Sequence, residues 1–261
     1  MLFTPNYEDP IPQHNTTRDL GILIDDDCSF SSQRKAAITK TNQRCGWVLR
    51  TFQTRDPHLL RFLWRTLCQP IQDYGSQLWS PVGDRRDLQA QEGPLRNFLR
   101  HFGNFKDENY WQRLRLTKLS SCERRNQRYR IIYVWKSLAG FVPSLGLHTR
   151  TDRRFGVLID IPKLTGNVCR IVTLKEKMIH TAGSKLFNCL PRTIREFVGN
   201  PLEFKAILDQ YLSLIPDCPI LPGYTSHNLD AENRQSNCII TWTKNLGLTN
   251  WTPDKYHDDM G

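Results

Sequence analysis

Apolar and polar residues alternate with a helical period over much of the first half of the chain. Apolar residues recur there every three or four positions, which is typical of helices that bury one side and expose the other. The pattern predicts helices near residues 31–52, 57–68, 85–102 and 120–139. We expect these helices to pack as a bundle that buries Trp135.

Residues that favour helix ends support these boundaries. Helix-starting residues precede three of the four segments: Ser31 or Ser32, Asp56 with Pro57, and Ser120 with Glu123. Asn200, Pro201 and Glu203 mark a further helix start downstream. Gly93-Pro94 should break or kink the third helix, because proline lacks the backbone N–H.

Short apolar runs predict a few strands. Residues 20–24 favour a buried strand that ends in the polar turn 25–27. β-branched runs within 155–175 flank Thr165-Gly166-Asn167 and predict a hairpin. The expected fold class is mainly α (α+β): a helical bundle, a short N-terminal strand, and a small β-hairpin plus helix unit near the C-terminus.

Proline, glycine and charge divide the chain into five expected parts. They are a lead-in with a strand (1–30), a basic helical domain (31–140), a linker (141–154), a small α+β unit (155–215) and a loosely ordered tail (216–261).

The charge is concentrated in the middle of the chain. The whole sequence carries a formal net charge of +10, whereas residues 34–155 alone carry 24 basic and nine acidic side chains. Such an excess favours a polyanion as partner, because each neutralised phosphate releases counterions. A solvated helical surface would give the same composition, so charge alone does not decide between the two.

Two groups of basic residues are the candidate nucleic-acid contacts. Both lie on predicted helices: Arg34, Lys35, Lys40 and Arg44 on the first, and Arg124, Arg125, Arg128 and Arg130 on the last. The second group sits near a helix N-terminus, where cations oppose the helix dipole, so we expect it to serve a partner. The alternative is plain surface, or pairing with local acids such as Asp107 and Glu108.

The sequence gives little support for a metal site, a catalytic nucleophile or a phosphate-binding loop. The eight cysteines include no Cys-x-x-Cys pair, the histidines are scattered, and the common nucleophile and phosphate-loop motifs are missing. No basic region followed by an apolar run begins the sequence, and no apolar stretch is long enough for a spanning helix. We therefore expect a nuclear or cytoplasmic protein that is not secreted and has no membrane partner.

Asp25-Asp26-Asp27 offers one alternative function. Adjacent carboxylates after an apolar strand can hold a divalent metal ion for phosphoryl transfer, as in a metal-dependent nuclease. A polar turn explains the same residues, and no second strand with a following Asp lies upstream.

The sequence resembles the C-terminal part of the reverse transcriptase of LINE-type, non-LTR retrotransposons of the jockey and chicken-repeat kind. Ordered motifs carry the resemblance over about residues 19–240: Asp19-Leu20-Gly21-Ile22, Cys28-Ser29-Phe30, Arg50-Thr51-Phe52, Arg55-Asp56, Pro70, Tyr74-Gly75-Ser76-Gln77-Leu78-Trp79-Ser80-Pro81, Arg113-Leu114-Arg115-Leu116, Glu123-Arg124-Arg125, residues 128–136, Lys185-Leu186-Phe187-Asn188-Cys189-Leu190-Pro191, Phe204-Lys205 and Ile215-Pro216-Asp217-x-Pro219.

The resemblance implies a template–primer-binding region. Residues 1–30 would hold the last palm-like strand, with Leu20 and Gly21 in a primer-grip-like position, and residues 31–140 a thumb-like bundle along the duplex. The family's catalytic aspartate and its Phe/Tyr-x-Asp-Asp hairpin precede the Leu-Gly strand, and neither precedes it here. We therefore expect a truncated remnant, inactive as an RNA-directed DNA polymerase on its own and without a cofactor, since Mg²⁺ would belong to the missing palm. A stand-alone basic RNA- or DNA-binding module is the alternative.

Overall fold

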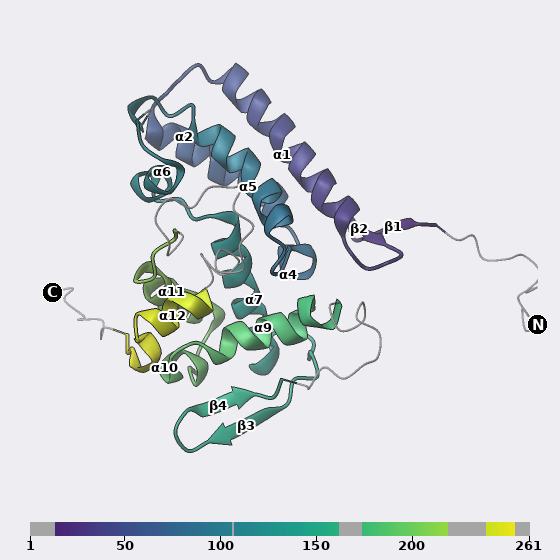
Figure 1. Ribbon diagram of the computed structural model, residues 1–261, viewed down its shortest axis with the longest axis vertical. Helices are drawn as coiled ribbons and strands as arrows, with labels where there is room; N and C mark the ends of the chain where they lie inside the picture. The colour runs from purple at the N-terminus through teal and green to yellow at the C-terminus, as the bar shows by residue number, and fades with distance from the viewer. Residues whose placement is uncertain (1–13, 106, 162–173, 219–238, 254–261) are drawn as a thin grey trace, which may run out of the picture.

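The computed structural model describes residues 14–105, 107–161, 174–218 and 239–253 (Figure 1). Over these residues the fold is mainly helical, with two separate two-stranded antiparallel sheets. The elements up to the middle of the chain are β1 Thr16–Asp19, β2 Ile22–Asp25, α1 Ser31–Thr51, α2 Pro57–Leu63, the π-helix Trp64–Cys68, α3 Gln69–Asp73, α4 Ser76–Trp79, α5 Arg85–Leu99, the 3₁₀ turn Gly103–Phe105, α6 Tyr110–Thr117 and α7 Cys122–Leu138. The later elements are β3 Thr149–Asp152, β4 Gly156–Ile159, α9 Ile179–Asn188, α10 Arg192–Arg195, α11 Pro201–Ser213, α12 Ile239–Asn245 and the 3₁₀ turn Leu248–Asn250.

Two apolar cores organise the molecule, one in each half of Figure 1. The upper core lies among α1, α2, the π-helix, α5 and α6, and its largest side chains are Trp64, Phe98 and Phe102. The lower core lies among α7, α9, α11 and α12, around Trp135 and Phe204. The predicted apolar stripes of α1, α2, α5, α7 and α11 enter these cores, and helices that the sequence did not predict, α6, α9 and α12, complete them. The mainly α (α+β) class is confirmed.

Helix α7 belongs to both halves. Its first two turns lie beside α4 and α5, whereas Ile131, Val134 and Trp135 from its second half enter the lower core. A helix that the sequence places in the first domain thus supplies the centre of the second.

Helix boundaries agree with the sequence where the cap is a local carboxylate or amide. Asp56 accepts a hydrogen bond from the Leu59 N–H, and Asn200 forms a capping box with Glu203. Ser120 is not a cap: Ser121 is the N-cap of α7 and accepts from the Arg124 N–H. The N-cap is therefore one residue later than predicted, and the predicted capping box with Glu123 does not form, because Arg124 occupies the N3 position. Asp217, distant in sequence, accepts hydrogen bonds from the Ser121 N–H and hydroxyl.

The start of α1 is also corrected. Neither Ser31 nor Ser32 caps it, and Phe30 occupies the N-cap position in a left-handed conformation without a side-chain bond. The Asp25 carboxylate at the end of β2 accepts from the Ser32 N–H at 3.1 Å instead. A cap from the preceding hairpin therefore replaces the local serine.

Helix α5 continues through Gly93-Pro94, so the predicted break is absent. Pro94 cannot donate to the carbonyl of Ala90. Leu95, Phe98 and Leu99 are all buried in the upper core. Tertiary packing therefore keeps the helix intact where local propensity would end it.

The C-terminal hairpin forms upstream of its predicted place. β4 pairs with β3, which lies in the predicted linker, while the expected turn at 165–167 falls outside the described residues. The Asp152 carboxylate accepts from the N–H groups of Arg154 and Phe155, at 2.8 and 2.9 Å, and so stabilises the tight turn between these strands.

Part of the expected tail is ordered. Helix α12 packs in the lower core, where Ile239 is fully buried and the Tyr211 and Thr243 hydroxyls are 2.7 Å apart. Residues 219–238 and 254–261 lie outside the described part of the chain. The prediction of a loose tail is therefore wrong for residues 239–253.

Candidate nucleic-acid interface

Helix α1 presents an exposed basic surface. It runs along the upper right edge of the molecule in Figure 1, and its sequence contains five Lys or Arg and no acidic residue. Lys35, Lys40 and Arg44 are exposed, as the sequence predicts for a basic helix side. Trp47 is 43% exposed, and the Arg44 guanidinium lies 5.5 Å from the centre of its ring.

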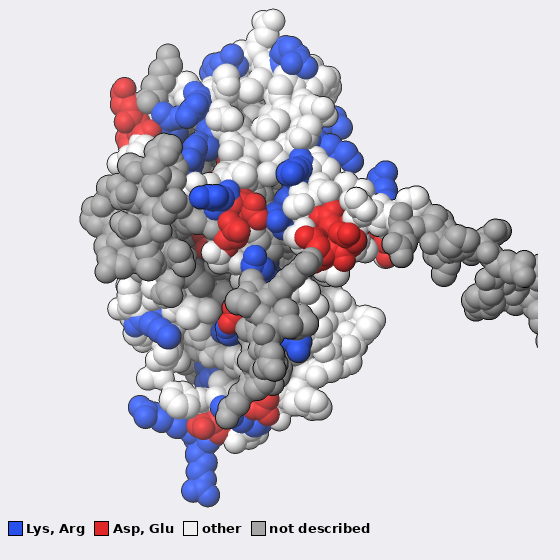
Figure 2. Space-filling view, turned by 45° about the vertical axis from the view of Figure 1, so that its right-hand side comes forward, with Lys and Arg blue, Asp and Glu red and all other residues white. Residues whose placement is uncertain are grey.

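The geometry of α1 suits a polyanion. Lys40, Arg44 and Trp47 follow one another at spacings of four and three, so they share one side of the helix. Figure 2 shows Lys and Arg side chains distributed over the upper half of this face of the molecule, with Asp and Glu near its middle and also at its upper left edge and its lower end. Arg34 is different, because its guanidinium bonds the Asp87 carboxylate at 2.7 Å and the Ser29 carbonyl.

The four α7 arginines occupy a different environment from the one predicted. Arg124, Arg125 and Arg130 are only 4%, 6% and 3% exposed. Arg128 is partly exposed, but it forms two bonds with the Asp209 carboxylate of α11. The expected basic face of this helix is therefore wrong for three of its four arginines.

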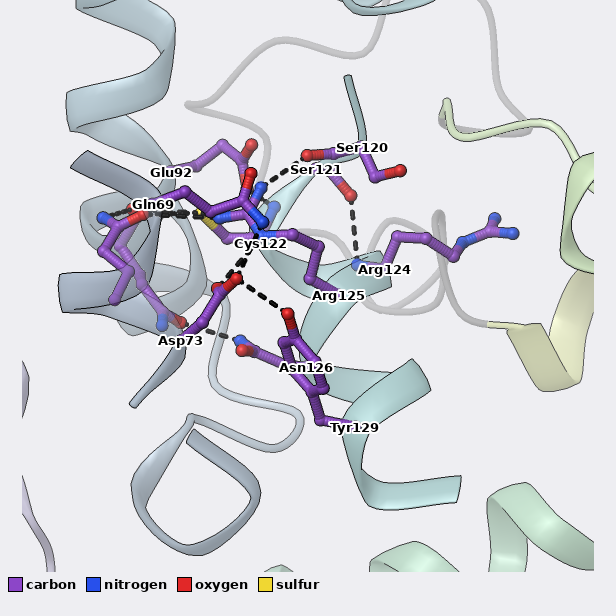
Figure 3. Close-up of polar contacts among 12 residues, drawn as sticks. Gln69, Asp73, Glu92, Ser120, Ser121, Cys122, Arg124, Arg125, Asn126 and Tyr129 are labelled. Atoms are coloured by element: carbon purple, nitrogen blue, oxygen red, sulfur yellow. Dashed lines mark hydrogen bonds and ion pairs between the residues drawn. The ribbon is translucent and has the colours of Figure 1, made fainter. Parts of the chain in front are cut away.

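Arg125 is the centre of a buried polar cluster (Figure 3). Its Nε donates to Asp73 Oδ1 at 3.1 Å, and its other nitrogens donate to the Ser120 carbonyl and to Gln72. Tyr129 also donates to Asp73, at 2.9 Å. Burial disfavours the charged guanidinium, but the surrounding acidic groups outweigh it and raise the pKa of Arg125.

A second buried acid lies in the same cluster. Glu92 accepts from the Tyr110 hydroxyl and from the Cys122 N–H, the latter at 2.8 Å. Burial raises the pKa of Glu92, and the Tyr110 hydrogen bond and the Arg125 charge oppose this rise. Burial also raises the pKa of the Cys122 thiol well above its usual range, so this thiol is not an activated nucleophile.

The remaining α7 arginines join the two halves of the fold. Arg124 donates to the carbonyls of Ile215 and Pro216, which follow α11. Arg130 donates to Ser80, which follows α4. These guanidinium groups satisfy carbonyls and a hydroxyl of distant segments, so their role in the fold is structural.

Leu20 and Gly21 do not lie in a strand. They form the two-residue turn between β1 and β2, with φ angles of 45° and 82°, as a type I′ hairpin requires. Leu20 is 82% exposed at this tip, and its carbonyl accepts from the Tyr74 hydroxyl at 2.8 Å. The predicted strand therefore begins at Ile22, and the primer-grip-like pair is a hairpin tip.

The acidic triplet is built into the hairpin–helix junction. The buried Asp25 carboxylate accepts hydrogen bonds from Thr16, Ser29, Ser31 and Ser32. Asp26 and Asp27 are exposed. Within the described residues, no three His, Cys, Asp or Glu side chains are grouped so that they could hold a metal ion.

Replacement of Asp25 by Ala is expected to lower the free energy of unfolding by about 1–2 kcal/mol, the usual loss for a helix N-cap. Burial disfavours the ionised carboxylate, but the hydrogen bonds from Ser32, Ser29 and Thr16 outweigh it and lower the pKa of Asp25 from 3.8 to about 2. The contribution is thus complete above pH 4 and is lost as the pH falls toward 2. Urea titrations at several pH values measure it.

Asp26→Ala is the matched control, because this neighbouring carboxylate is exposed. We expect a change within about 0.5 kcal/mol for this variant. Equal losses for Asp25→Ala and Asp26→Ala, or an Asp25 effect that does not diminish in acid, would contradict the capping role.

A cleft opens between α6 and α11, and Arg125 and Tyr129 of the buried cluster line it. Its volume is about 1470 Å³. Four basic residues lie along its wall, namely Arg65, Arg96, Arg115 and Lys118, together with Tyr110 and Trp111 of α6. Sequence reasoning missed this site, although the two adjacent aromatic residues at 110 and 111, followed by arginines at 113 and 115, were a visible signal.

The catalytic pattern Phe/Tyr-x-Asp-Asp of the family that the sequence resembles occurs once in the sequence. Tyr256-His257-Asp258-Asp259 fits Phe/Tyr-x-Asp-Asp, but it lies near the opposite end from the Leu-Gly segment and outside the described residues. Its position differs from the one that the resemblance requires.

Comparison with protein families, curated proteins and solved structures found no match to this chain. None of the helices in the described residues is long and apolar enough to cross a membrane.

Proposed function

We propose that this chain is a nucleic-acid-binding part of a LINE-type reverse transcriptase and that α1 contacts the phosphate backbone of a template–primer duplex. The basic surface of α1 carries the proposal: Lys35, Lys40 and Arg44 are exposed on a helix that has no acid of its own. Each such cation that meets a phosphate releases counterions, which favours binding without sequence preference. The ordered motifs of the resemblance support the identity of the partner.

The candidate contacts differ from the sequence-based set. Arg124, Arg125 and Arg130 are internal, and Arg34 and Arg128 are engaged with carboxylates, so the duplex contacts are assigned to Lys35, Lys40 and Arg44. No observation favours the alternative function, a metal-dependent nuclease, because the Asp25 carboxylate accepts a hydrogen bond from the Ser32 N–H and so stabilises the hairpin–helix junction.

Replacement of Lys35, Lys40 and Arg44 together by Ala is expected to reduce the salt dependence of duplex binding. Each phosphate contact contributes about 0.9 to the slope of log affinity against log salt for duplex DNA, so the slope should fall by roughly two to three units. Fluorescence anisotropy with a duplex and with an RNA–DNA hybrid, at several salt concentrations, measures it.

The β3–β4 hairpin supplies a matched control. Arg150, Arg153 and Arg154 are exposed there, at the bottom of Figure 1 and far from α1, so their triple Ala variant removes the same charge. We expect this control to keep the wild-type slope. An unchanged slope in the α1 variant, or equal losses in both variants, would refute the α1 interface.

A further inference from the structure

The charges around the cleft between α6 and α11 do not balance. The α7 arginines that line it, Arg124, Arg125 and Arg128, meet carbonyls or carboxylates of the protein itself. Its four wall cations, defined above, behave differently: among the residues that the structure describes, none of them forms an ion pair. The cleft therefore has an excess of positive charge on the side that faces an entering ligand.

Two of the wall cations have uncharged partners. Arg65 donates to the Lys118 carbonyl at 2.8 Å, and the Arg96 guanidinium lies 4.9 Å from the centre of the Tyr110 ring. The buried Nε atoms of Arg96 and Arg124 have no hydrogen-bond partner in the described part of the molecule. Unsatisfied buried donors are rare in proteins and favour a nearby acceptor, which a bound anion would supply.

Aromatic rings stand beside these cations. Tyr110 and Trp111 are in edge-to-face contact at 4.9 Å, and both are partly exposed in the cleft. Alternating cations and partly exposed aromatic rings are the arrangement by which proteins bind unpaired bases and their phosphates. A duplex would not expose base faces to these rings.

The size of the cleft favours a polymeric ligand. Pockets for single small molecules typically occupy about 300–1,000 Å³, and this cleft exceeds that range. Several linked nucleotides would fill it and present one phosphate to each of several cations. Its elements lie on the left of Figure 1, whereas α1 forms the right edge of the upper half, so the two surfaces are separate.

We propose that this cleft is a second nucleic-acid site, which binds a short single-stranded RNA or DNA segment. Arg65, Arg115 and Lys118 contact phosphates, and a base stacks on Trp111. This assignment goes beyond the duplex surface of α1 and does not depend on it.

Anisotropy of labelled oligo-uridylate and oligo-thymidylate, measured with the full chain, tests the charged contacts. The double variant Arg115→Ala/Lys118→Ala is expected to reduce the slope of log affinity against log salt by about 1.4, since each single-strand phosphate contributes about 0.7. Both side chains are exposed, so the variant should fold as the wild type does, which circular dichroism verifies.

The stacking contact has a separate test. Trp111→Leu is expected to weaken single-strand binding by at least about fivefold with an unchanged salt slope, and Trp111→Phe should retain most of the affinity. If Trp111→Leu weakened binding only by unfolding the protein, Trp111→Phe should weaken it too. Affinity that is retained with Phe but lost with Leu therefore indicates a stacking contact.

The α1 triple variant distinguishes this proposal from the preceding one. It should retain single-strand binding, while the cleft variants retain duplex binding. A wild-type salt slope in the Arg115/Lys118 variant, or loss of single-strand binding only when α1 is changed, would overturn the cleft assignment and leave the duplex surface intact. An unaltered duplex slope in the α1 variant would instead refute only the duplex surface.

Discussion

Arg125→Ala is expected to lower the free energy of unfolding by about 3–5 kcal/mol, the usual loss when one partner of a buried ion pair is removed. Arg125 and Asp73 are both largely buried, and their side chains are 3.1 Å apart. Without the guanidinium, the donors to Asp73 among the described residues are the hydroxyl of Tyr129 and the amide of Gln69. Urea unfolding followed by circular dichroism measures the loss.

Arg128→Ala is the control for this prediction. It removes the same side chain one turn further along α7, but its partner Asp209 is 50% exposed. Exposed pairs typically contribute about 0–1 kcal/mol. A loss below 1 kcal/mol for Arg125→Ala, or one equal to that of Arg128→Ala, would show that the buried cluster does not stabilise the fold.

Trp135→Ala is expected to cost about 3–5 kcal/mol of the free energy of unfolding, as replacement of a buried large aromatic usually does. The ring is only 3% exposed and is stacked on Phe204, with centroids 4.2 Å apart and an interplanar angle of 6°. It also contacts Phe141 and Phe197. The replacement leaves a cavity among these rings, and the same urea titration reports its cost.

Trp47→Ala provides the matched comparison, because it is the same Trp-to-Ala replacement at a position on the exposed side of α1. We expect a change within about 0.5 kcal/mol there. Similar losses at the two positions would contradict the assignment of Trp135 to the centre of the lower core.

The arginines of α7 change how the charge of the chain should be interpreted. Residues 34–155 carry a formal excess of +15, but several of these cations neutralise acids within the fold. The cations to which we assign nucleic-acid contacts lie on α1 and along the wall of the cleft, and other exposed cations, such as those of the β3–β4 hairpin, belong to neither surface. Functional charge is therefore a property of surfaces, and the density of Lys and Arg along the sequence overestimates it.

The sequence by itself determined α1, α2, α5, α7 and α11 and their buried sides, whereas α6, α9 and α12 were not predicted. The caps at Asp56 and Asn200 and the burial of Trp135 follow from contacts within a few residues or from a single period, so they are visible in the linear pattern. The exposure of Lys35, Lys40 and Arg44 follows for the same reason, because the apolar stripe of α1 directs these residues outward.

Only the tertiary structure decided which groups the α7 arginines contact and where the cleft lies. The carboxylates that meet Arg125 and Arg128 belong to Asp73 and Asp209, which lie 52 and 81 positions away in the chain. The partner of β4 and the capping role of Asp25 likewise came from segments that the local pattern does not connect. A charged side chain is favourable in solvent, and it is tolerated inside when an opposite charge or a set of hydrogen-bond partners offsets its desolvation. Residue type alone therefore cannot decide between surface and interior, whereas an apolar side chain has only one favourable place.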